Sequence, residues 1–323
     1  MNKVQLTNTD LVVSPICLGT MHYGDQLNSE ESGRQLDEFL SCGGNFVDTA
    51  HVYGTWVPGL GSSSEEYIGK WFSSSGKRHS VVLSTKGAHP AGAHKEIKRV
   101  TPDAINKDLE ESLKLLQTDY IDLYFLHRDD PDVPVEGIID TLEKAVKDGK
   151  IRYYAASNWS VERIKEADAY AASIGSHGFA ANQLMFSLAD ITHSGVEDKT
   201  LELMDEKTYA FHSKTKMSVL SFTSIAKGYF MKRYEGRKIT TPEVYDNESN
   251  DELYSFLLPY VERGEYTFTE LSFLYELAIK DFPVIPIASF HNNDQLKNAV
   301  AAWDKTLPSE IMDGIKKIKK FVW

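Results

Sequence analysis

The sequence has few cysteines, fewer basic than acidic side chains and no long apolar stretch. Its 323 residues include only two cysteines, Cys17 and Cys42, each in an apolar setting. We expect both to be buried thiols in a reducing compartment rather than parts of a disulfide or metal framework. No apolar run reaches the length of a membrane span, and the N-terminus lacks the charged region and apolar run of a signal peptide. We therefore expect a soluble, cytoplasmic protein.

The shortage of positive charge limits the choice of partner. Lysine and arginine number 35 against 47 aspartates and glutamates, which gives a net charge of −12. Nucleic acids and anionic membranes are themselves negative, so we expect neither as a partner, and solubility alone can account for the charge. A small molecule is the expected partner, and the sequence does not specify an oligomeric state.

Short apolar runs alternate with helical patterns along most of the chain. Each run closes on a polar or small residue, and each helical pattern spaces apolar residues three and four apart. The runs are 16–18, 45–47, 80–83, 120–126, 152–156, 180–181, 218–220 and 284–285. The helical patterns are 30–42, 64–73, 102–117, 135–148, 160–174, 195–213, 267–280 and 293–303. The alternation predicts one (β/α)₈ TIM barrel, a single domain over residues 1–323.

Three further segments fall outside the alternation. Residues 3–13 have the turn composition of a β-hairpin. Residues 231–266 are longer and more polar than a barrel loop needs, which predicts an insertion after the seventh strand. The lysine-rich residues 316–320 predict a solvated basic helix end. A doubly wound open sheet is the alternative fold, but no Gly-x-Gly-x-x-Gly follows the first strand.

Four side chains fall where a barrel carries its chemistry, at the C-terminal ends of strands. Asp48 and Lys86 end the second and third strands, His127 follows the fourth, and Tyr53 comes shortly after Asp48. Singly, each has a structural explanation: a helix cap, a surface lysine, a core histidine or a loop tyrosine. Together on one rim they indicate a catalytic site.

Electrostatics suggest what such a site does. A free phenol has a pKa near 10, and an ammonium about 4 Å away favours phenolate by roughly 4 kcal/mol at an effective dielectric of about 20, or about three pKa units. We therefore expect Lys86 to lower the pKa of Tyr53, Asp48 to keep Lys86 charged, and His127 to orient a substrate oxygen. A tuned acid beside a polarised carbonyl suits reduction of an aldehyde or ketone by hydride.

The motifs around these residues resemble those of the aldo-keto reductase family. They are Asp48-Thr-Ala-x-x-Tyr53-Gly, Ser84-Thr-Lys86 and Leu126-His127-Arg128-x-Asp130, and the resemblance covers nearly the whole chain. It implies an NAD(P)-dependent oxidoreductase that interconverts a carbonyl and an alcohol, with Tyr53 as general acid and base. A different class remains open, because some proteins that resemble this family are nucleotide-sensing regulatory subunits of ion channels.

The same resemblance implies where the cofactor binds. The first strand's loop lies beside the nicotinamide, polar residues after the fifth and sixth strands bind its carboxamide, and the loop after the seventh strand holds an aromatic ring and the pyrophosphate. The implied residues are Gly19, Thr20, Met21, Asp48, Ser157, Asn158, Gln183, Phe222, Thr223, Ile225, Lys227 and Gly228. One departure is Ser224, where the family usually has proline.

The adenosine end departs further from the family pattern. No lysine or arginine occurs between Lys280 and Lys297. A 2′-phosphate normally needs a guanidinium or an ammonium, so we expect relaxed choice between NADP and NAD, with NADH usable. The residues assigned to this end are Ala288, Ser289, His291, Gln295 and Asn298.

The rim loops give a hypothesis about the substrate. Tyr23, Trp56 and Trp159 are candidate pocket walls beside His127, although ordinary loop packing would explain each aromatic residue equally well. Further rim residues are hydrogen-bonding groups, namely His22, His51, His89 and Arg128. Such a rim favours a sugar, polyol or other hydroxylated carbonyl over a steroid. The histidines lack the spacing of a metal site, so we expect no metal.

Overall fold

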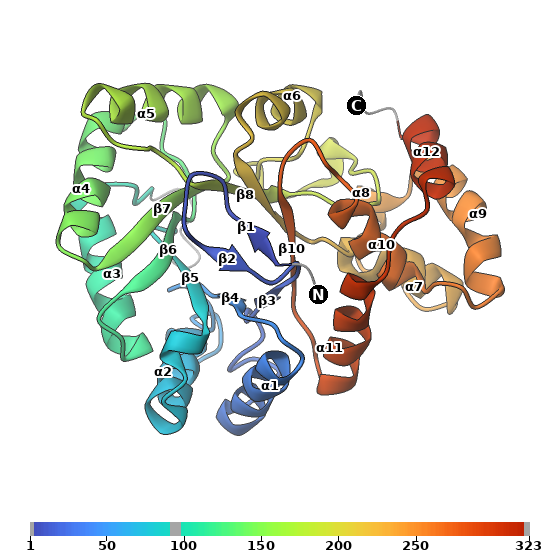
Figure 1. Ribbon diagram of the computed structural model, residues 1–323, viewed down its shortest axis with the longest axis horizontal. Helices are drawn as coiled ribbons and strands as arrows, with labels where there is room; N and C mark the ends of the chain where they lie inside the picture. Colours follow the sequence, from blue (N-terminus) through green and yellow to red (C-terminus); the bar gives the residue numbers. More distant parts are fainter. Residues whose placement is uncertain (1–2, 91–97, 320–323) are drawn as a thin grey trace.

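The protein is a (β/α)₈ barrel. The computed structural model describes residues 3–90 and 98–319. Eight parallel strands close in the order β10-β3-β4-β5-β6-β7-β8-β9 (Figure 1), which confirms the predicted fold. The strands are β3 Cys17–Gly19, β4 Phe46–Asp48, β5 Val82–Gly87, β6 Ile121–Leu126, β7 Ile151–Ser157, β8 Ala181–Met185, β9 Ser218–Phe222 and β10 Val284–Ala288.

A β-hairpin closes the N-terminal end of the barrel, as predicted. Strands β1 (Val4–Gln5) and β2 (Val12–Val13) pair antiparallel, and Asn8 between them has the left-handed φ of 57° that asparagine tolerates in turns. Figure 1 shows the hairpin lying across the barrel axis. Its Leu6 and Leu11 pack into the same apolar cluster as interior strand side chains such as Phe46. The C-terminal ends of the strands are therefore left for the chemistry.

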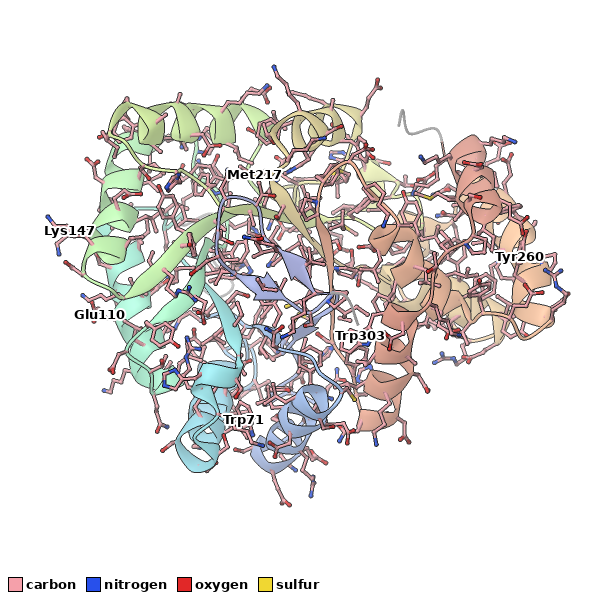
Figure 2. All side chains as sticks on the ribbon, in the orientation of Figure 1. Trp71, Glu110, Lys147, Met217, Tyr260 and Trp303 are labelled. Carbon is pink, nitrogen blue, oxygen red and sulfur yellow. The ribbon has the colours of Figure 1, made fainter. Side chains whose placement is uncertain are left out.

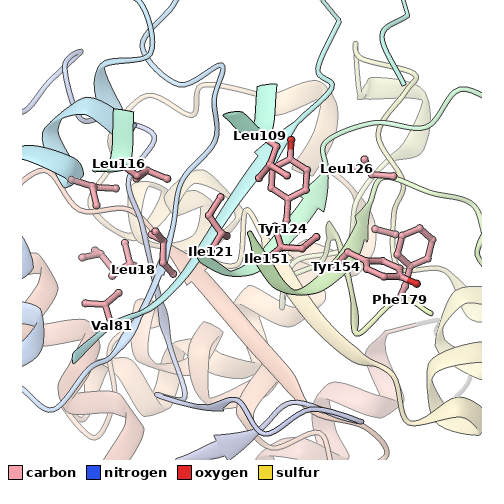
Figure 3. Packing of buried hydrophobic residues seen from close by; sticks show 14 of the residues in the cluster. Leu18, Val81, Leu109, Leu116, Ile121, Tyr124, Leu126, Ile151, Tyr154 and Phe179 are labelled. Carbon is pink, nitrogen blue, oxygen red and sulfur yellow. The ribbon is translucent and has the colours of Figure 1, made fainter. Parts of the chain in front are cut away.

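Successive residues of a barrel strand point alternately into the barrel interior and toward the outer helices, so the core has two layers. Cys17 points into the barrel, whereas the next residue, Leu18, joins the cluster between strands and outer helices. Figure 3 shows that outer cluster around Leu18 and Tyr124, and Figure 2 labels three further members of it, Trp71, Met217 and Trp303. Both cysteines are free thiols, Cys17 buried as expected and Cys42 only partly buried.

Eight principal helices follow the strands. They are α1 Ser29–Ser41, α2 Ser63–Ser75, α3 Pro102–Leu116, α4 Val135–Lys147, α5 Val161–Ser173, α6 Glu206–Thr215, α10 Phe268–Leu277 and α11 Asn293–Val300. Local signals set several boundaries. Asn28 and Glu31 form a capping box at α1, and Gly76 ends α2 in the left-handed conformation. No helix among the described residues combines the length and apolar character needed to cross a bilayer.

The prediction of a helix over residues 195–213 was wrong at its start. Helix α6 begins only at Glu206, after a short 3₁₀ turn at His193–Gly195 and an extended segment. Leu203 forms a parallel bridge with Met185, and the Met204 amide donates to the Met185 carbonyl at 3.0 Å. Pairing with the end of β8 therefore outweighs the helical spacing of these apolar residues.

The insertion after the seventh barrel strand, β9, is helical. It contains α7 Tyr229–Tyr234, α8 Pro242–Tyr245 and α9 Glu248–Glu262, and α12 Ser309–Ile318 packs beside α9 (Figure 1). These helices share an apolar cluster with the outer side of β8 and β9. The insertion thus enlarges the core on one flank of the barrel.

The expectation of a solvated lysine-rich end is wrong for Lys319. Its ammonium is buried, donates to the carbonyls of Ser187 and Leu188, and lies 2.7 Å from an Asp190 carboxylate oxygen. The aliphatic stem and the paired carboxylate make burial of this lysine tolerable. Lys320 lies outside the described residues.

Candidate active site

The four candidate catalytic side chains meet at the C-terminal rim. Asp48 ends β4, Lys86 lies in β5 and His127 follows β6, and these three strands are hydrogen-bonded neighbours. The Lys86 ammonium lies 2.6 Å from an Asp48 carboxylate oxygen and 3.2 Å from the Tyr53 hydroxyl. It also donates to the Thr49 carbonyl at 2.7 Å. The sequence-based expectation that these residues converge therefore agrees with the geometry.

The Asp48–Lys86 pair is buried and fully hydrogen-bonded. Asp48 accepts from the Ser84 hydroxyl at 2.8 Å and from the Gln183 amide at 3.2 Å, besides the ammonium. Burial of two charges is costly unless further hydrogen bonds satisfy them. These surrounding donors meet that requirement and fix the direction of the ammonium toward the phenol.

The pKa values differ from expectation in one respect. Burial alone would lower the pKa of the Lys86 ammonium, but Asp48 and Tyr53 together raise it above the usual value. Burial raises the pKa of the Tyr53 phenol by more than the Lys86 ammonium lowers it, and Asp48 adds to the rise. The expected net decrease for Tyr53 is therefore wrong: the sign of the lysine's effect holds, but desolvation of the phenolate is larger.

His127 is held as a neutral imidazole. Burial lowers its pKa well below the ordinary value, and His89, Arg128 and Lys86 lower it further. Its ring stands edge-on to Tyr53 at 5.9 Å between centroids. Within the described residues its Nδ1 has no hydrogen-bond partner. A neutral imidazole beside the phenol can donate a hydrogen bond to a substrate oxygen.

The residues assigned to the nicotinamide gather around the same rim. Ser157 ends β7, and the Asn158 amide donates to the Ser157 hydroxyl at 3.0 Å, while Gln183 in β8 bonds Asp48. The Thr20 hydroxyl donates to the Asp48 carbonyl at 2.9 Å. Met21 is exposed beside them. These groups therefore border one region next to the Lys86–Tyr53 pair.

The loop after β9 contains several residues with left-handed backbone. Thr223, Ala226 and Lys227 have left-handed φ values of 54°, 48° and 53°, and Gly228 follows at 75°. Strained non-glycine backbone of this kind gathers at functional sites, and consecutive backbone amides in such turns form concavities that bind anions. Ser224, in place of the usual proline, donates to the Ile287 carbonyl at 2.8 Å and so ties the loop to β10. The amides of Ala226 and Gly228 donate to the carbonyls of Thr223 and Ile225, so a pyrophosphate in this loop would be bound by its other groups.

The backbone of Gly19 lies close to side chains at the end of β10. A Cβ on this residue would lie 2.8 Å from the Ser289 hydroxyl and 2.9 Å from an Ile287 methyl. Any larger residue would therefore displace the Ser289 or Ile287 side chain where β3 meets β10. Phe222, Ile225 and Ala288 lie on the same side of the barrel, at the ends of β9 and β10.

The segment assigned to the adenosine end carries polar side chains but no lysine or arginine before Lys297. The His291 amide donates to the Gln295 side chain at 3.0 Å, and Asn292 caps α11. Lys297, the next basic residue along the chain, is paired with Glu38 at 3.4 Å. Asn298 lies within α11. The geometry therefore supplies no guanidinium from this segment.

Two of the three aromatic residues predicted to line the substrate pocket are buried in the protein instead. Tyr23 and Trp159 are each only 1% exposed, and their polar atoms bond Gln35 and the Arg128 carbonyl. Aromatic residues with one polar atom are readily buried when that atom finds a partner. Trp56, in contrast, is 48% exposed, with its ring centroid 6.2 Å from that of Tyr53.

A cavity of about 240 Å³ lies beside Lys86 and includes residues that the sequence did not single out. Arg99 and Asp108 line it and form an ion pair at 2.6 Å. His51, Asp108 and Glu111 bring ligand atoms within 4.8 Å of one another, as a metal site would. Each is already engaged in ion pairs, so we assign no metal there. No sequence motif marks Arg99 or Asp108, which meet only in the fold.

The fold and the site define a barrel with a lysine–carboxylate–tyrosine cluster at its catalytic rim. Residues 15–320 match the model of the Aldo/keto reductase family, and the chain belongs to that family. An uncharacterized oxidoreductase, YrpG, of Bacillus subtilis is 36% identical over 197 residues, which are 59% of this chain and 60% of YrpG.

Fungal relatives carry more specific names. The aryl-alcohol dehydrogenase [NADP(+)] of Phanerodontia chrysosporium is 33% identical over 186 residues, which cover 52% of this chain and 47% of that protein. An aryl-alcohol dehydrogenase of Pestalotiopsis microspora is 25% identical over 94% of this chain and 78% of its own length. The matched segments thus span less than two thirds of YrpG and of the Phanerodontia enzyme.

Proposed function

We propose that this protein is an NAD(P)-dependent oxidoreductase that interconverts a carbonyl and an alcohol, with Tyr53 as general acid and base. The observation that carries the proposal is the chain of contacts from Asp48 to Lys86 at 2.6 Å and from Lys86 to the Tyr53 hydroxyl at 3.2 Å. Membership of the Aldo/keto reductase family supports it.

The residues divide the work as follows. A bound nicotinamide supplies or accepts the hydride. In reduction, Tyr53 gives its proton to the carbonyl oxygen, and the Lys86 ammonium stabilises the resulting phenolate. Asp48 keeps Lys86 charged, and neutral His127 donates to the substrate oxygen and orients it. In oxidation, the Tyr53 phenolate removes the proton from the alcohol.

The cofactor proposal combines the two ends of its site. We place the pyrophosphate in the loop after β9, which contains the left-handed backbone of Thr223, Ala226 and Lys227. Where a 2′-phosphate would lie, His291 and Gln295 take the place of a guanidinium or an ammonium. One relative is named for NADP(+). We therefore propose that the enzyme accepts NADP and NAD, with NADH usable.

The substrate proposal follows from the exposed rim. Polar side chains such as those of His89 and Thr55 line the cavity beside Lys86, and a hydrogen-bonding lining favours a hydroxylated carbonyl such as a sugar aldehyde. Exposed Trp56 beside Tyr53 provides an aromatic wall. Together with the names of the aryl-alcohol dehydrogenases, this makes aryl aldehydes the second class to test.

Tyr53→Phe tests the proposal. We expect turnover of aldehydes to fall by roughly 10²- to 10⁴-fold, the usual contribution of a general acid, while cofactor binding, followed by nicotinamide fluorescence, is retained. A wild-type protein that binds cofactor but turns over neither sugar nor aryl aldehydes would instead support the nucleotide-sensing alternative. Equal turnover by wild type and Tyr53→Phe would refute the assigned role of Tyr53.

A further inference from the structure

A buried carboxylate connects the two chain segments that carry Tyr53 and Lys86. Glu65 lies in the first turn of α2 and has no exposed surface. One of its oxygens accepts from the Thr85 hydroxyl at 2.6 Å, and the other lies 3.1 Å from Nδ1 of His51. Thr85 directly precedes Lys86, and His51 lies in the loop that leads to Tyr53. Glu65 therefore holds both segments at once.

Backbone hydrogen bonds reinforce this connection. The His51 amide donates to the Lys86 carbonyl at 2.9 Å, and the Ser64 amide donates to the Tyr53 carbonyl at 3.3 Å. Ser64 is the neighbour of Glu65, so α2 begins in contact with the Tyr53 segment. The position of the Tyr53 backbone relative to Lys86 is thus set by groups that lie outside the reacting centre.

His51 is clamped between two carboxylates from different helices. Its Nε2 lies 3.1 Å from Glu111 of α3, opposite the contact with Glu65 of α2. Burial alone would lower the pKa of His51, but Glu65, Asp108 and Glu111 together raise it. Two neighbouring cations share these carboxylates: Lys107 lies 3.9 Å from the second oxygen of Glu111, and Arg99 is paired with Asp108. Through its two contacts with Glu65 and Glu111, His51 joins α2 to α3.

We infer that Glu65 and His51 are positioning residues that set the separation of the Tyr53 hydroxyl from the Lys86 ammonium. Neither side chain contacts either group directly in the described structure, so both act through the chain segments they hold. The inference rests on the proposed function, in which that separation governs proton transfer.

The expected size of the effect follows from the distance dependence of charge interactions. The hydroxyl and the ammonium nitrogen are 3.2 Å apart. Lengthening this distance by about 1 Å, at an effective dielectric of about 20, weakens the preference for phenolate by roughly tenfold. We call the contacts of Glu65 with Thr85 and His51, and of His51 with Glu111, the Glu65 clamp. Loosening this clamp should therefore reduce the rate of proton transfer without removing any catalytic group.

The experiment uses His51→Gln and Glu65→Gln in the full-length protein. We expect kcat for aldehyde reduction to fall about tenfold in each variant, while the Kd of the cofactor stays within twofold. We also expect the phenol of Tyr53 to titrate at higher pH, measured as the ultraviolet phenolate signal of each protein minus that of the same protein carrying Tyr53→Phe. His51→Lys, whose ammonium can still pair with the carboxylates of Glu65 and Glu111, should recover part of the loss.

Asp122→Asn is the matched control. Asp122 is also a buried carboxylate in an ion pair, 2.9 Å from Arg78, but it lies near the N-terminal end of β6. Its loss should lower the free energy of unfolding without changing kcat or the Tyr53 titration. If Glu65→Gln does not fold, Thr85→Val breaks the same clamp from the β5 side and is measured in its place.

The outcomes separate the two proposals. Active wild-type protein whose His51→Gln variant keeps its kcat and its Tyr53 titration within twofold would overturn the positioning role and leave the function intact. A wild-type protein inactive on every carbonyl would overturn the function, and the phenol titration would still decide the role of the clamp. A loss of kcat of equal size in Asp122→Asn would show that stability alone is responsible and would also overturn the inference.

Discussion

The Lys86 ammonium lies against the ring of Tyr53, with its nitrogen 4.7 Å from the ring centroid. The same ammonium is 3.2 Å from the hydroxyl, so it interacts mainly with the oxygen and more weakly with the ring of the same phenol. Both interactions gain strength when the ring acquires negative charge. The pair is therefore arranged to stabilise the phenolate that forms during reduction more than the phenol that precedes it.

Replacing Lys86 with methionine should impair both activity and stability. We expect kcat to fall by at least roughly 10²-fold, because the phenolate loses its counter-charge. Asp48 is left buried without its cation, which should cost about 3–5 kcal/mol in the free energy of unfolding. Urea unfolding measures this loss. Lys70→Met is the control: its exposed pair with Glu66 should contribute less than about 1 kcal/mol.

The rate of reduction should be insensitive to pH across the neutral range. Tyr53 must be protonated to act as the acid, and burial raises its pKa above the ordinary value of 10.0. Activity should therefore decline only as pH rises through that raised pKa, at or above about 10. Alcohol oxidation needs the phenolate and should increase with pH over the same range. Rates in both directions in one buffer series measure this, and a reductive rate that halves between about pH 7 and 8 would contradict it.

His212 should make the fold sensitive to acid. Burial lowers its pKa from 6.5 to about 4, although its bond to the Met217 carbonyl opposes the shift. The unfolded chain therefore takes up a proton below pH 6.5 that the folded chain does not. The contribution of His212 to the free energy of unfolding is fully present above about pH 6.5, and it falls by about 3 kcal/mol as the pH approaches 4. Urea unfolding of His212→Gln should show a pH slope smaller by about one proton, whereas an unchanged slope would argue against this origin.

His291→Arg should create a preference for the phosphorylated cofactor. His291 is exposed and lies just before helix α11. The nearest basic residue that follows it in the chain, Lys297, forms an ion pair with Glu38. A guanidinium there should tighten NADPH by about tenfold or more, the scale of one charge-assisted hydrogen bond, and leave NADH nearly unchanged. Fluorescence titration with both cofactors tests this. His79→Arg, which adds the same charge beside the start of β5, should alter neither affinity.

Trp56→Ala should discriminate among substrates. Its exposed ring beside Tyr53 can pack on an aromatic substrate, a contact that contributes about 0.5–1.5 kcal/mol. We expect KM for aryl aldehydes to rise by about three- to tenfold, with little change for small aliphatic aldehydes or for cofactor Kd. Equal KM changes for both substrate types would exclude an aromatic wall.

The sequence contains enough information to predict the barrel and the meeting of the four rim side chains. Strand and helix periods are local, and parallel strands bring their C-terminal ends to one rim, so Asp48, Lys86 and His127 could be placed together. Side-chain direction in loops is not local. Tyr23 and Trp159 turn inward because Gln35 and the Arg128 carbonyl receive their polar atoms, and neither partner is visible from sequence spacing.

The net pKa shift of Tyr53 is harder to predict from sequence than the position of its side chain. The effect of Lys86 on Tyr53 could be given a sign, but the larger effect of burial depends on how completely the fold encloses the phenol. Pairing of Leu203 with Met185 likewise depends on the end of β8, which lies far from the helical pattern that it interrupts. The Glu65 clamp joins three separate segments and carries no motif of its own.

The burial of Lys319 has a practical consequence for shortened versions of the chain. Removing this residue by proteolytic trimming would take away the cation that faces Asp190 and release the carbonyls of Ser187 and Leu188, which belong to the segment following β8. Strand β8 also carries Gln183, which donates to Asp48. Removal of Lys319 should therefore disturb the candidate active site as well as helix α12.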